Sequence, residues 1–295
     1  MRRRTILGIM LTLSVFKERL PAAPVSAKTV IYPTEATGEK VEENEKCVID
    51  YSNCQDGYVV VQFKEQTTKV IKAQVKKGSR TYTYTLRKQS NEVLPLTEGN
   101  GTYKITVFEQ FQGNDYVTVG AASISVKFTD QFAPFLRPNQ YVNFNKSTKF
   151  VKKAASLTKK SKTDLAKVKK IYNYVVKNMK YDNKKAKTVQ KGYLPNLNSL
   201  YKKKKGICFD YAATMTAMLR SQGVPTKLVI GYTGKTYHAW INVYSKKKGW
   251  ITGAIYISGK KWKLMDPTFA STGKSSKSIM KYIENKKNYK AQYSY

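Results

Sequence analysis

Three residues in the second half of the chain have side chains suited to nucleophilic chemistry. From Cys208 onward, a segment that includes AATMTAMLRSQG predicts a helix ending at Gly223. A helix start favours a thiolate, which is the reactive form of cysteine. His238 is the only histidine of the chain and therefore the only imidazole that can pair with this thiol. Asp266 has the carboxylate needed to hold such a ring in the useful tautomer. The three residues predict a nucleophile, a base and an orienting group.

The elements that must position these residues can also be read from the pattern. TDLAKVKKIYNYVVKNMKYD carries an apolar stripe at i, i+3 and i+4 from Leu165 to Met179, with Thr163 as a plausible N-cap. After Cys208, the segments KLVIGY, YHAWINVY, GAIYIS and KWKLMD predict strands of an antiparallel sheet. Helices followed by strands indicate an α+β domain, which we place at 148–295.

At these residues the chain resembles the transglutaminase-like superfamily. GICFDYAATMTAMLRSQGVPTKLVIGY is similar to its cysteine motif, YHAWINVY to its His-Ala-Trp strand, and WKLMDPTF to its Asp-Pro-Thr strand. VKNMKYD is similar to the end of the helix before the cysteine motif. The resemblance covers about residues 150–270. It implies a papain-like α+β core and acyl transfer through a thioester, with Cys208 as nucleophile, His238 as base and Asp266 as orienting carboxylate.

Acyl transfer also needs an oxyanion hole. The backbone N–H of Cys208 is the expected first donor. A second donor should come from a side chain upstream, where Tyr193, Asn196, Asn198 and Tyr201 are all candidates, and we favour Tyr201. Asp210, two residues after the nucleophile, is interpreted as a first-turn acid that suits the helix dipole.

The first half of the chain has an all-β pattern. YVVVQF, VIKAQV, RTYTYTL, TYKITVF, YVTVG and ASISVKF are rich in β-branched and aromatic residues and are separated by turn signals. Short strands at this spacing predict an immunoglobulin-like β-sandwich over 28–130. An acidic lead-in occupies 28–46, and a Pro- and Asn-containing stretch at 131–147 predicts a linker. The fold class is therefore two domains.

The N-terminus predicts export. Three arginines precede the apolar stretch TILGIMLTLSVF, and a small-residue cleavage site ends at Ala27, so residues 1–27 are interpreted as a signal peptide. In an oxidising compartment, Cys47 and Cys54 are close enough in sequence to predict a disulfide. Cys208 then remains as a free thiol.

Charge is unevenly distributed along the chain. Residues 28–130 hold thirteen basic and thirteen acidic residues, whereas 131–295 hold 36 basic and five acidic residues, a net of +31. We expect this half to meet a polyanion, and outside the cell an anionic wall polymer or membrane surface fits better than nucleic acid. No zinc-finger, RRM, KH or basic-zipper signature is present. One histidine and three cysteines at these spacings do not predict a zinc site, and no cofactor is implied.

The sequence favours an extracellular thiol acyltransferase or hydrolase acting on protein or peptide amides. A cysteine peptidase or wall-peptide amidase on the same core is the second hypothesis. A non-catalytic, basic wall-binding module is the third, and retention of cysteine, histidine and aspartate together argues against it.

Overall fold

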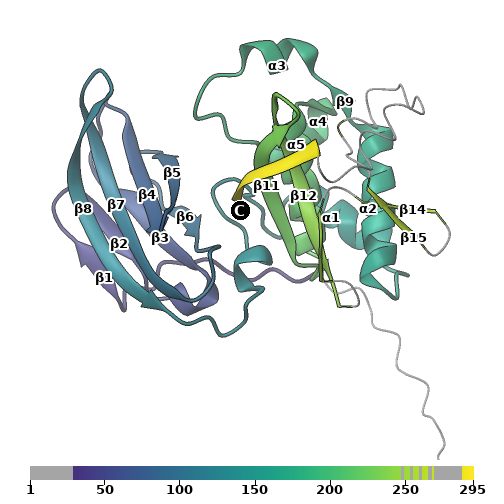
Figure 1. Ribbon diagram of the computed structural model, residues 1–295, viewed down its shortest axis with the longest axis horizontal. Helices are drawn as coiled ribbons and strands as arrows, with labels where there is room; N and C mark the ends of the chain where they lie inside the picture. The colour runs from purple at the N-terminus through teal and green to yellow at the C-terminus, as the bar shows by residue number, and fades with distance from the viewer. Residues whose placement is uncertain (1–28, 247–248, 253–254, 259–260, 265–267, 269–287) are drawn as a thin grey trace, which may run out of the picture.

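The structure is a computed structural model of the 295-residue chain, and it describes residues 29–246, 249–252, 255–258, 261–264, 268 and 288–295. The predicted signal peptide lies outside the described residues, and so does Asp266. The chain forms two halves that lie side by side (Figure 1). The N-terminal half is made of β-sheets, and the C-terminal half combines helices with a β-sheet. A chain segment that passes between the halves joins them.

The first half consists of two four-stranded antiparallel sheets. One has the order β1 (Val41–Glu43), β2 (Cys47–Asp50), β3 (Tyr58–Phe63) and β6 (Glu92–Pro95). The other has the order β5 (Arg80–Leu86), β4 (Ile71–Lys77), β7 (Gly101–Gln112) and β8 (Asp115–Val126). Buried and outward residues alternate along β4, as expected for a strand with one face on a core. The buried faces of both sheets contribute to one continuous apolar cluster.

Several strands differ from the sequence prediction. The segment YVTVG and the first five residues of ASISVKF belong to a single strand, β8, whose pairing with β7 shifts register between Val107 and Phe108. Strands β1, β2 and β6 were not predicted, and β1 falls inside the segment interpreted as an acidic lead-in. β1 is an edge strand, where exposed charges such as Glu42 and Glu43 discourage pairing with other chains. The immunoglobulin-like assignment of these two sheets stays a prediction.

The predicted disulfide is wrong, because all three cysteines are free thiols. Cys47 is buried at the start of β2, and its Sγ lies 3.7 Å from the Val119 carbonyl oxygen on β8. Cys54 begins the short 3₁₀ helix η1 (Cys54–Asp56) beyond the other end of that strand. An extended strand advances about 3.3 Å per residue, so β2 separates the two thiols despite their short spacing in the sequence. Burial raises the pKa of the Cys47 thiol.

The second half combines helices with an antiparallel sheet. Its helices are α1 (Lys149–Thr158), α2 (Asp164–Asn178), α3 (Asn183–Thr188), α4 (Leu197–Lys203) and α5 (Cys208–Arg220). The sheet has the order β13 (Gly249–Ile251), β12 (Thr236–Ser245), β11 (Thr226–Thr233) and β16 (Tyr289–Ser294). β14 (Ile255–Ser258) and β15 (Lys261–Leu264) pair as a separate hairpin, and β9 (Lys180–Tyr181) pairs in parallel with β10 (Lys205–Gly206). The described residues thus form an α+β domain, as predicted.

Helices α2 and α5 form where the sequence predicts them. The Thr163 hydroxyl accepts a hydrogen bond from the Ala166 N–H at 3.2 Å and caps α2, whose buried side chains are those of the predicted apolar stripe. Helix α5 is the central helix, and eleven of its thirteen residues are buried. Gly223, with a φ of 72°, adopts the left-handed conformation that follows its end.

The segment predicted as a linker packs between the halves. It contains the 3₁₀ helix η2 (Ala133–Phe135), and its buried side chains include Phe135, Val142 and Phe144. Arg220, at the end of α5, is fully buried and donates to three backbone carbonyls: those of Arg137, Thr226 and Tyr295. Burial lowers the pKa of Arg220 to about 9.

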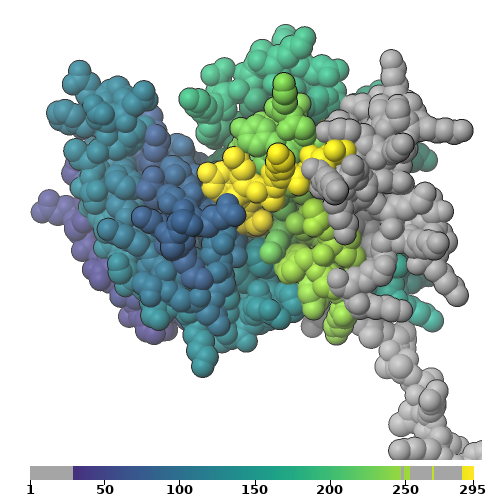
Figure 2. All heavy atoms as spheres, viewed as in Figure 1, coloured from purple at the N-terminus to yellow at the C-terminus, as the bar shows by residue number. Residues whose placement is uncertain are grey.

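Strand β16 joins the two halves from the other side. In Figure 2 its atoms, in yellow, lie between the N-terminal sheets and the β11–β12 hairpin. The Arg80 guanidinium donates to the Gln292 carbonyl at 2.9 Å, and Tyr82 packs edge-on against Tyr293 and Tyr295 with centroids 5.4 Å away. The two halves therefore share buried aromatic contacts through β16 as well as through the linker.

Candidate functional site

Cys208 occupies the first position of helix α5 and is partly exposed. Ile207 precedes it with an extended backbone, at φ −96° and ψ 178°, which ends the short β10 strand and begins the helix. The first turn of a helix carries unpaired N–H groups and the positive end of the dipole. The local backbone therefore places the Cys208 thiol at the start of a helix, as the sequence predicts.

His238 lies on β12, which follows α5 and β11 in the chain. It pairs with Gly231 on β11, is 6% exposed, and stacks on Trp240 with centroids 6.2 Å apart and planes 21° apart. Glycine at 231 leaves room for two neighbours, because a Cβ there would lie 2.1 Å from the Lys290 carbonyl and 2.9 Å from the Trp240 ring. The close packing of β16 and Trp240 on this glycine fixes the strand that carries the imidazole.

Cys208 and His238 line the same cavity, which has a volume of about 480 Å³. Its walls come from the segment around α3, the start of α5 and the β11–β12 hairpin. They are mostly apolar or aromatic and consist of Tyr181, Ala186, Val189, Gln190, Gly192, Tyr193, Ile207, Cys208, Phe209, Ile230, Thr236, Tyr237, His238 and Ala239. Val189 and Tyr237 are 38% and 57% exposed, so part of the apolar wall is open to an incoming molecule. The arrangement brings a thiol and an imidazole together in a largely apolar recess.

Asp210 ties one wall of this cavity to the nucleophile helix. Its carboxylate is fully buried and accepts hydrogen bonds from the Ile207 N–H at 2.8 Å, the Lys185 ammonium at 2.6 Å and the Tyr193 hydroxyl at 2.5 Å. The predicted first-turn acid is therefore also the anchor of the α3 segment. Burial, followed by the neighbouring Asp210, raises the pKa of Tyr193. A Cβ on Gly206 would lie 2.6 Å from the Cβ of Asp210, so the strand before the nucleophile needs a glycine.

Residues 151–253 match the family model described as the transglutaminase-like superfamily. This part of the chain is a transglutaminase-like core. The match contains Cys208 and His238 and ends before Asp266.

Known proteins similar to the chain cover different parts of it. The uncharacterized protein YebA of Bacillus subtilis (strain 168) is 31% identical over 71 aligned residues, which cover 18% of this chain and only 10% of YebA. The periplasmic domain of TgpA from Pseudomonas aeruginosa is 13% identical, with a TM-score of 0.37, over 82% of this chain and 78% of that one. Red sea bream transglutaminase is 12% identical, with a TM-score of 0.33, over 77% of this chain and 53% of that one.

Tyr201 and Asp266 are the other predicted site residues of the transglutaminase-like core. Tyr201 does not line the cavity: its ring packs on Phe150 with centroids 5.0 Å apart, and the Lys204 ammonium lies 3.7 Å from its ring centroid. The preference for Tyr201 as a second oxyanion donor is therefore wrong. The reason is that α4, which carries it, turns this residue toward α1. Asp266 lies outside the described residues.

Three tyrosines do line the cavity of the transglutaminase-like core. Tyr181 is brought there by the β9–β10 pairing, which sets it beside Gly206, and it belongs to the VKNMKYD motif. Tyr193 was one of the sequence candidates, but its hydroxyl already contacts Asp210. Tyr237 was missed, although it directly precedes the histidine, and burial raises its pKa.

Across the residues that the structure describes, no three or more His, Cys, Asp or Glu side chains come together in a way that could hold a metal ion. Within those ranges no helix combines the length and the apolar character needed to span a bilayer.

Proposed function

We propose that the chain is a thiol acyltransferase or hydrolase that acts on protein or peptide amides. Cys208 is the nucleophile, His238 is the general base and Asp266 is the carboxylate that orients the imidazole. The observation that carries the proposal is the shared cavity: a cysteine at the first position of a buried helix and the only histidine of the chain line one apolar recess. The match of this segment to the transglutaminase-like superfamily supports it.

In the proposed mechanism, the Cys208 thiol gives its proton to His238 and the thiolate attacks the carbonyl carbon of the amide. The negative charge that develops on the carbonyl oxygen is stabilised by the first N–H groups of α5, including that of Cys208. The carbon–nitrogen bond then breaks, and the departing nitrogen takes the proton from His238. The resulting thioester is attacked by an amine, which gives an isopeptide bond, or by water, which gives the carboxylate. Either route frees the thiol.

The apolar walls of the cavity suit a substrate amide whose neighbouring groups are apolar. The walls contributed by Val189, Phe209 and Tyr237 offer flat or aliphatic surface next to the thiol. Such walls exclude part of the bulk water from the thioester. Tyr181 and Gln190 are two of the uncharged polar side chains of the cavity, and they replace Tyr201 as our candidates for the second oxyanion donor.

We propose further that the enzyme is exported and works at an anionic wall polymer or membrane surface. The charge distribution supports this, since the net of +31 is confined to residues 131–295. The helices α3 and α4, which flank the nucleophile segment, carry lysines in their last turns. The two N-terminal sheets, which we propose to be an immunoglobulin-like sandwich, are electrically neutral in comparison.

The proposal is tested by incubating the protein with a glutamine-containing peptide and a labelled primary amine, followed by mass spectrometry. The amine adduct identifies an acyltransferase, the deamidated peptide identifies a hydrolase, and a cleaved peptide backbone identifies a peptidase. A Cys208→Ala variant is the matched control and should give none of these products. Equal product formation by the folded variant and the unaltered chain would contradict the assignment of the nucleophile.

A further inference from the structure

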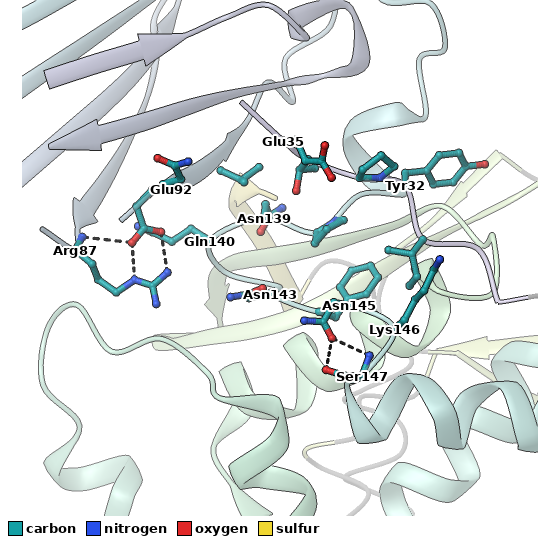
Figure 3. A pocket seen from close by; sticks show the side chains of 17 residues that line it. Tyr32, Glu35, Arg87, Glu92, Asn139, Gln140, Asn143, Asn145, Lys146 and Ser147 are labelled. Carbon is teal, nitrogen blue, oxygen red and sulfur yellow. Dashed lines mark hydrogen bonds and ion pairs between the residues drawn. The ribbon is translucent and has the colours of Figure 1, made fainter. Parts of the chain in front are cut away.

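A second, larger cavity lies between the two halves, away from the cysteine. It has a volume of about 700 Å³, within the range of cavities that hold small ligands. Its walls come from the segment 31–35, the segment 87–93 around the start of β6, and the linker from 138 to 147. Figure 3 shows the polar side chains of these segments gathered around it, among them Arg87, Glu92, Asn139 and Gln140.

Two buried side chains of this cavity have polar atoms without a partner. Asn139 and Gln140 are 4% and 6% exposed, and both line the cavity. Asn139 Nδ2 and Gln140 Oε1 have no hydrogen-bond partner among the described residues. Buried polar groups are almost always satisfied in folded proteins, so an unpaired donor and an unpaired acceptor on consecutive residues need an explanation. A ligand in the cavity would provide one.

The orientation of both amides is fixed by their other atoms. Asn139 Oδ1 accepts from the N–H groups of Tyr141 and Val142, both at 3.0 Å, so the free end is the NH₂ donor. Gln140 Nε2 donates to the Thr85 carbonyl at 2.8 Å, so its free end is the carbonyl acceptor. The site therefore offers one donor and one acceptor from consecutive residues, which is the pair that an amide group requires.

The charges of the cavity balance, in contrast to those of the surrounding chain. Arg87 donates to the buried Glu92 carboxylate through its Nε at 2.5 Å and through a second nitrogen at 3.3 Å. Glu35 and Lys146 contribute one further charge of each sign. The charged residues of the cavity lining therefore sum to zero, although the whole chain carries +35. A lining without net charge does not favour a polyanion. It suits a neutral, polar ligand.

The cavity continues toward the transglutaminase-like core. A neighbouring recess of about 220 Å³ shares Arg87, Gln140 and Asn143 with it and is lined beyond them by Asn196 and Asn198, at the start of α4. Side-chain amides thus follow the groove from the N-terminal sheets to the catalytic half. The Oδ1 atoms of Asn196 and Asn198 accept the N–H groups of Ser199 at 2.9 Å and Lys149 at 3.1 Å, so these two amides offer NH₂ donors, which suit hydroxyl and carbonyl oxygens.

We propose that this amide-lined groove binds a neutral saccharide chain that bears acetamido groups. The Asn139 NH₂ donates to an acetamido carbonyl oxygen, and the Gln140 carbonyl accepts from an acetamido N–H. The remaining amides and the Tyr32 ring contact hydroxyls and the apolar face of the sugar ring. The site holds a glycan at the junction of the two halves while the cysteine cavity is free to act on an amide.

The test is isothermal titration calorimetry of the full chain carrying Cys208→Ala, which excludes turnover. The probes are chitotetraose, in which every sugar bears an acetamido group, cellotetraose, in which hydroxyls replace those groups, and a neutral tetrapeptide. We expect chitotetraose to bind at least tenfold more tightly than either of the other probes. Binding is independent of catalysis, so failure here leaves the proposed function untouched.

Two variants probe the groove and one serves as a matched control. Asn139→Asp keeps the acceptor for the two backbone N–H groups and replaces only the unpaired donor. Asn143→Ala removes an exposed amide shared by both recesses. Asn100→Asp is the control, because Asn100 Oδ1 also accepts a backbone N–H, from Phe128 at 2.9 Å, outside the groove.

We expect both groove variants to weaken chitotetraose binding at least tenfold and Asn100→Asp to leave it unchanged. Equal affinity for cellotetraose, binding of the tetrapeptide alone, or no heat with any probe at millimolar concentration would each overturn the proposal. So would chitotetraose binding that is unaffected in both groove variants.

Discussion

The buried Asp210 carboxylate makes a quantitative prediction about the nucleophile helix. Asp210→Asn keeps the size of the side chain but removes its charge and leaves one oxygen for three donors, on Ile207, Lys185 and Tyr193. Breaking a buried ion pair by removing one partner costs about 3–5 kcal/mol. The Lys185 side chain is 26% exposed and can regain water, and asparagine keeps one acceptor. We therefore expect the free energy of unfolding to fall by about 2–3 kcal/mol.

The assay is urea unfolding at neutral pH, followed by fluorescence, with Asp164→Asn as the matched control. Asp164 is also a first-turn acid with a lysine partner, Lys167 at 3.0 Å, but its side chain is 39% exposed. An exposed pair of this kind contributes about 0–1 kcal/mol. Loss of the Asp210 contacts should also release the α3 segment, so trypsin should cut within residues 183–196 faster in Asp210→Asn. If Asp210→Asn is no more destabilising than Asp164→Asn, the reasoning about this network fails.

Four further outcomes are expected. Measured as kcat/KM, Cys208→Ala should abolish activity, His238→Ala should lower it nearly as far, and Asp266→Asn should leave some activity. Residues that act as a unit show such strongly non-additive losses. Near-normal turnover of the histidine variant would overturn its role. Iodoacetamide should label Cys208 near neutral pH faster than a model thiol, measured by mass spectrometry, and equal rates would argue against an activated thiol. Gly206→Ala should lower the free energy of unfolding by about 1–3 kcal/mol, because its Cβ overlaps that of Asp210, and an unchanged urea midpoint would contradict this. Full-length protein should sediment with anionic vesicles at low salt and dissociate as salt rises, since screening acts within about 8 Å at physiological salt; failure to sediment at low salt would leave solubility as the role of the charge.

Periodicity and capping chemistry were sufficient to predict the helices around the nucleophile. The apolar stripe of α2 and its Thr163 cap are local features, because each depends only on residues a few positions apart in the sequence. The strand that carries His238 was also predicted from local sequence, and YHAWINVY lies within the single strand β12, in which the four residues after the exposed Tyr237 are buried. The sharing of one cavity by Cys208 and His238 followed from the family resemblance rather than from any local pattern.

Features that depend on distant parts of the chain were missed. Tyr201 and Tyr193 are alike in the sequence, and only the folding of the α3 segment onto Asp210 brings Tyr193 to the cavity. Cys47 and Cys54 are near in sequence, but the intervening β2 strand keeps them apart. The edge strand β1 was interpreted as an acidic lead-in because its charges serve to protect an edge rather than to build a core.

The three hydrogen bonds of Arg220 have a mechanical consequence. The guanidinium joins the last turn of α5 to the linker at Arg137 and to the end of the chain at Tyr295, while the first residue of the same helix is the nucleophile. A force that pulls the N-terminal sheets away from the catalytic half, such as tension along a polymer bound by both, would load the linker and β16, which both connect the halves. Because Arg220 contacts Arg137 in the linker and Tyr295 directly after β16, part of that load would reach the helix that begins with the nucleophile.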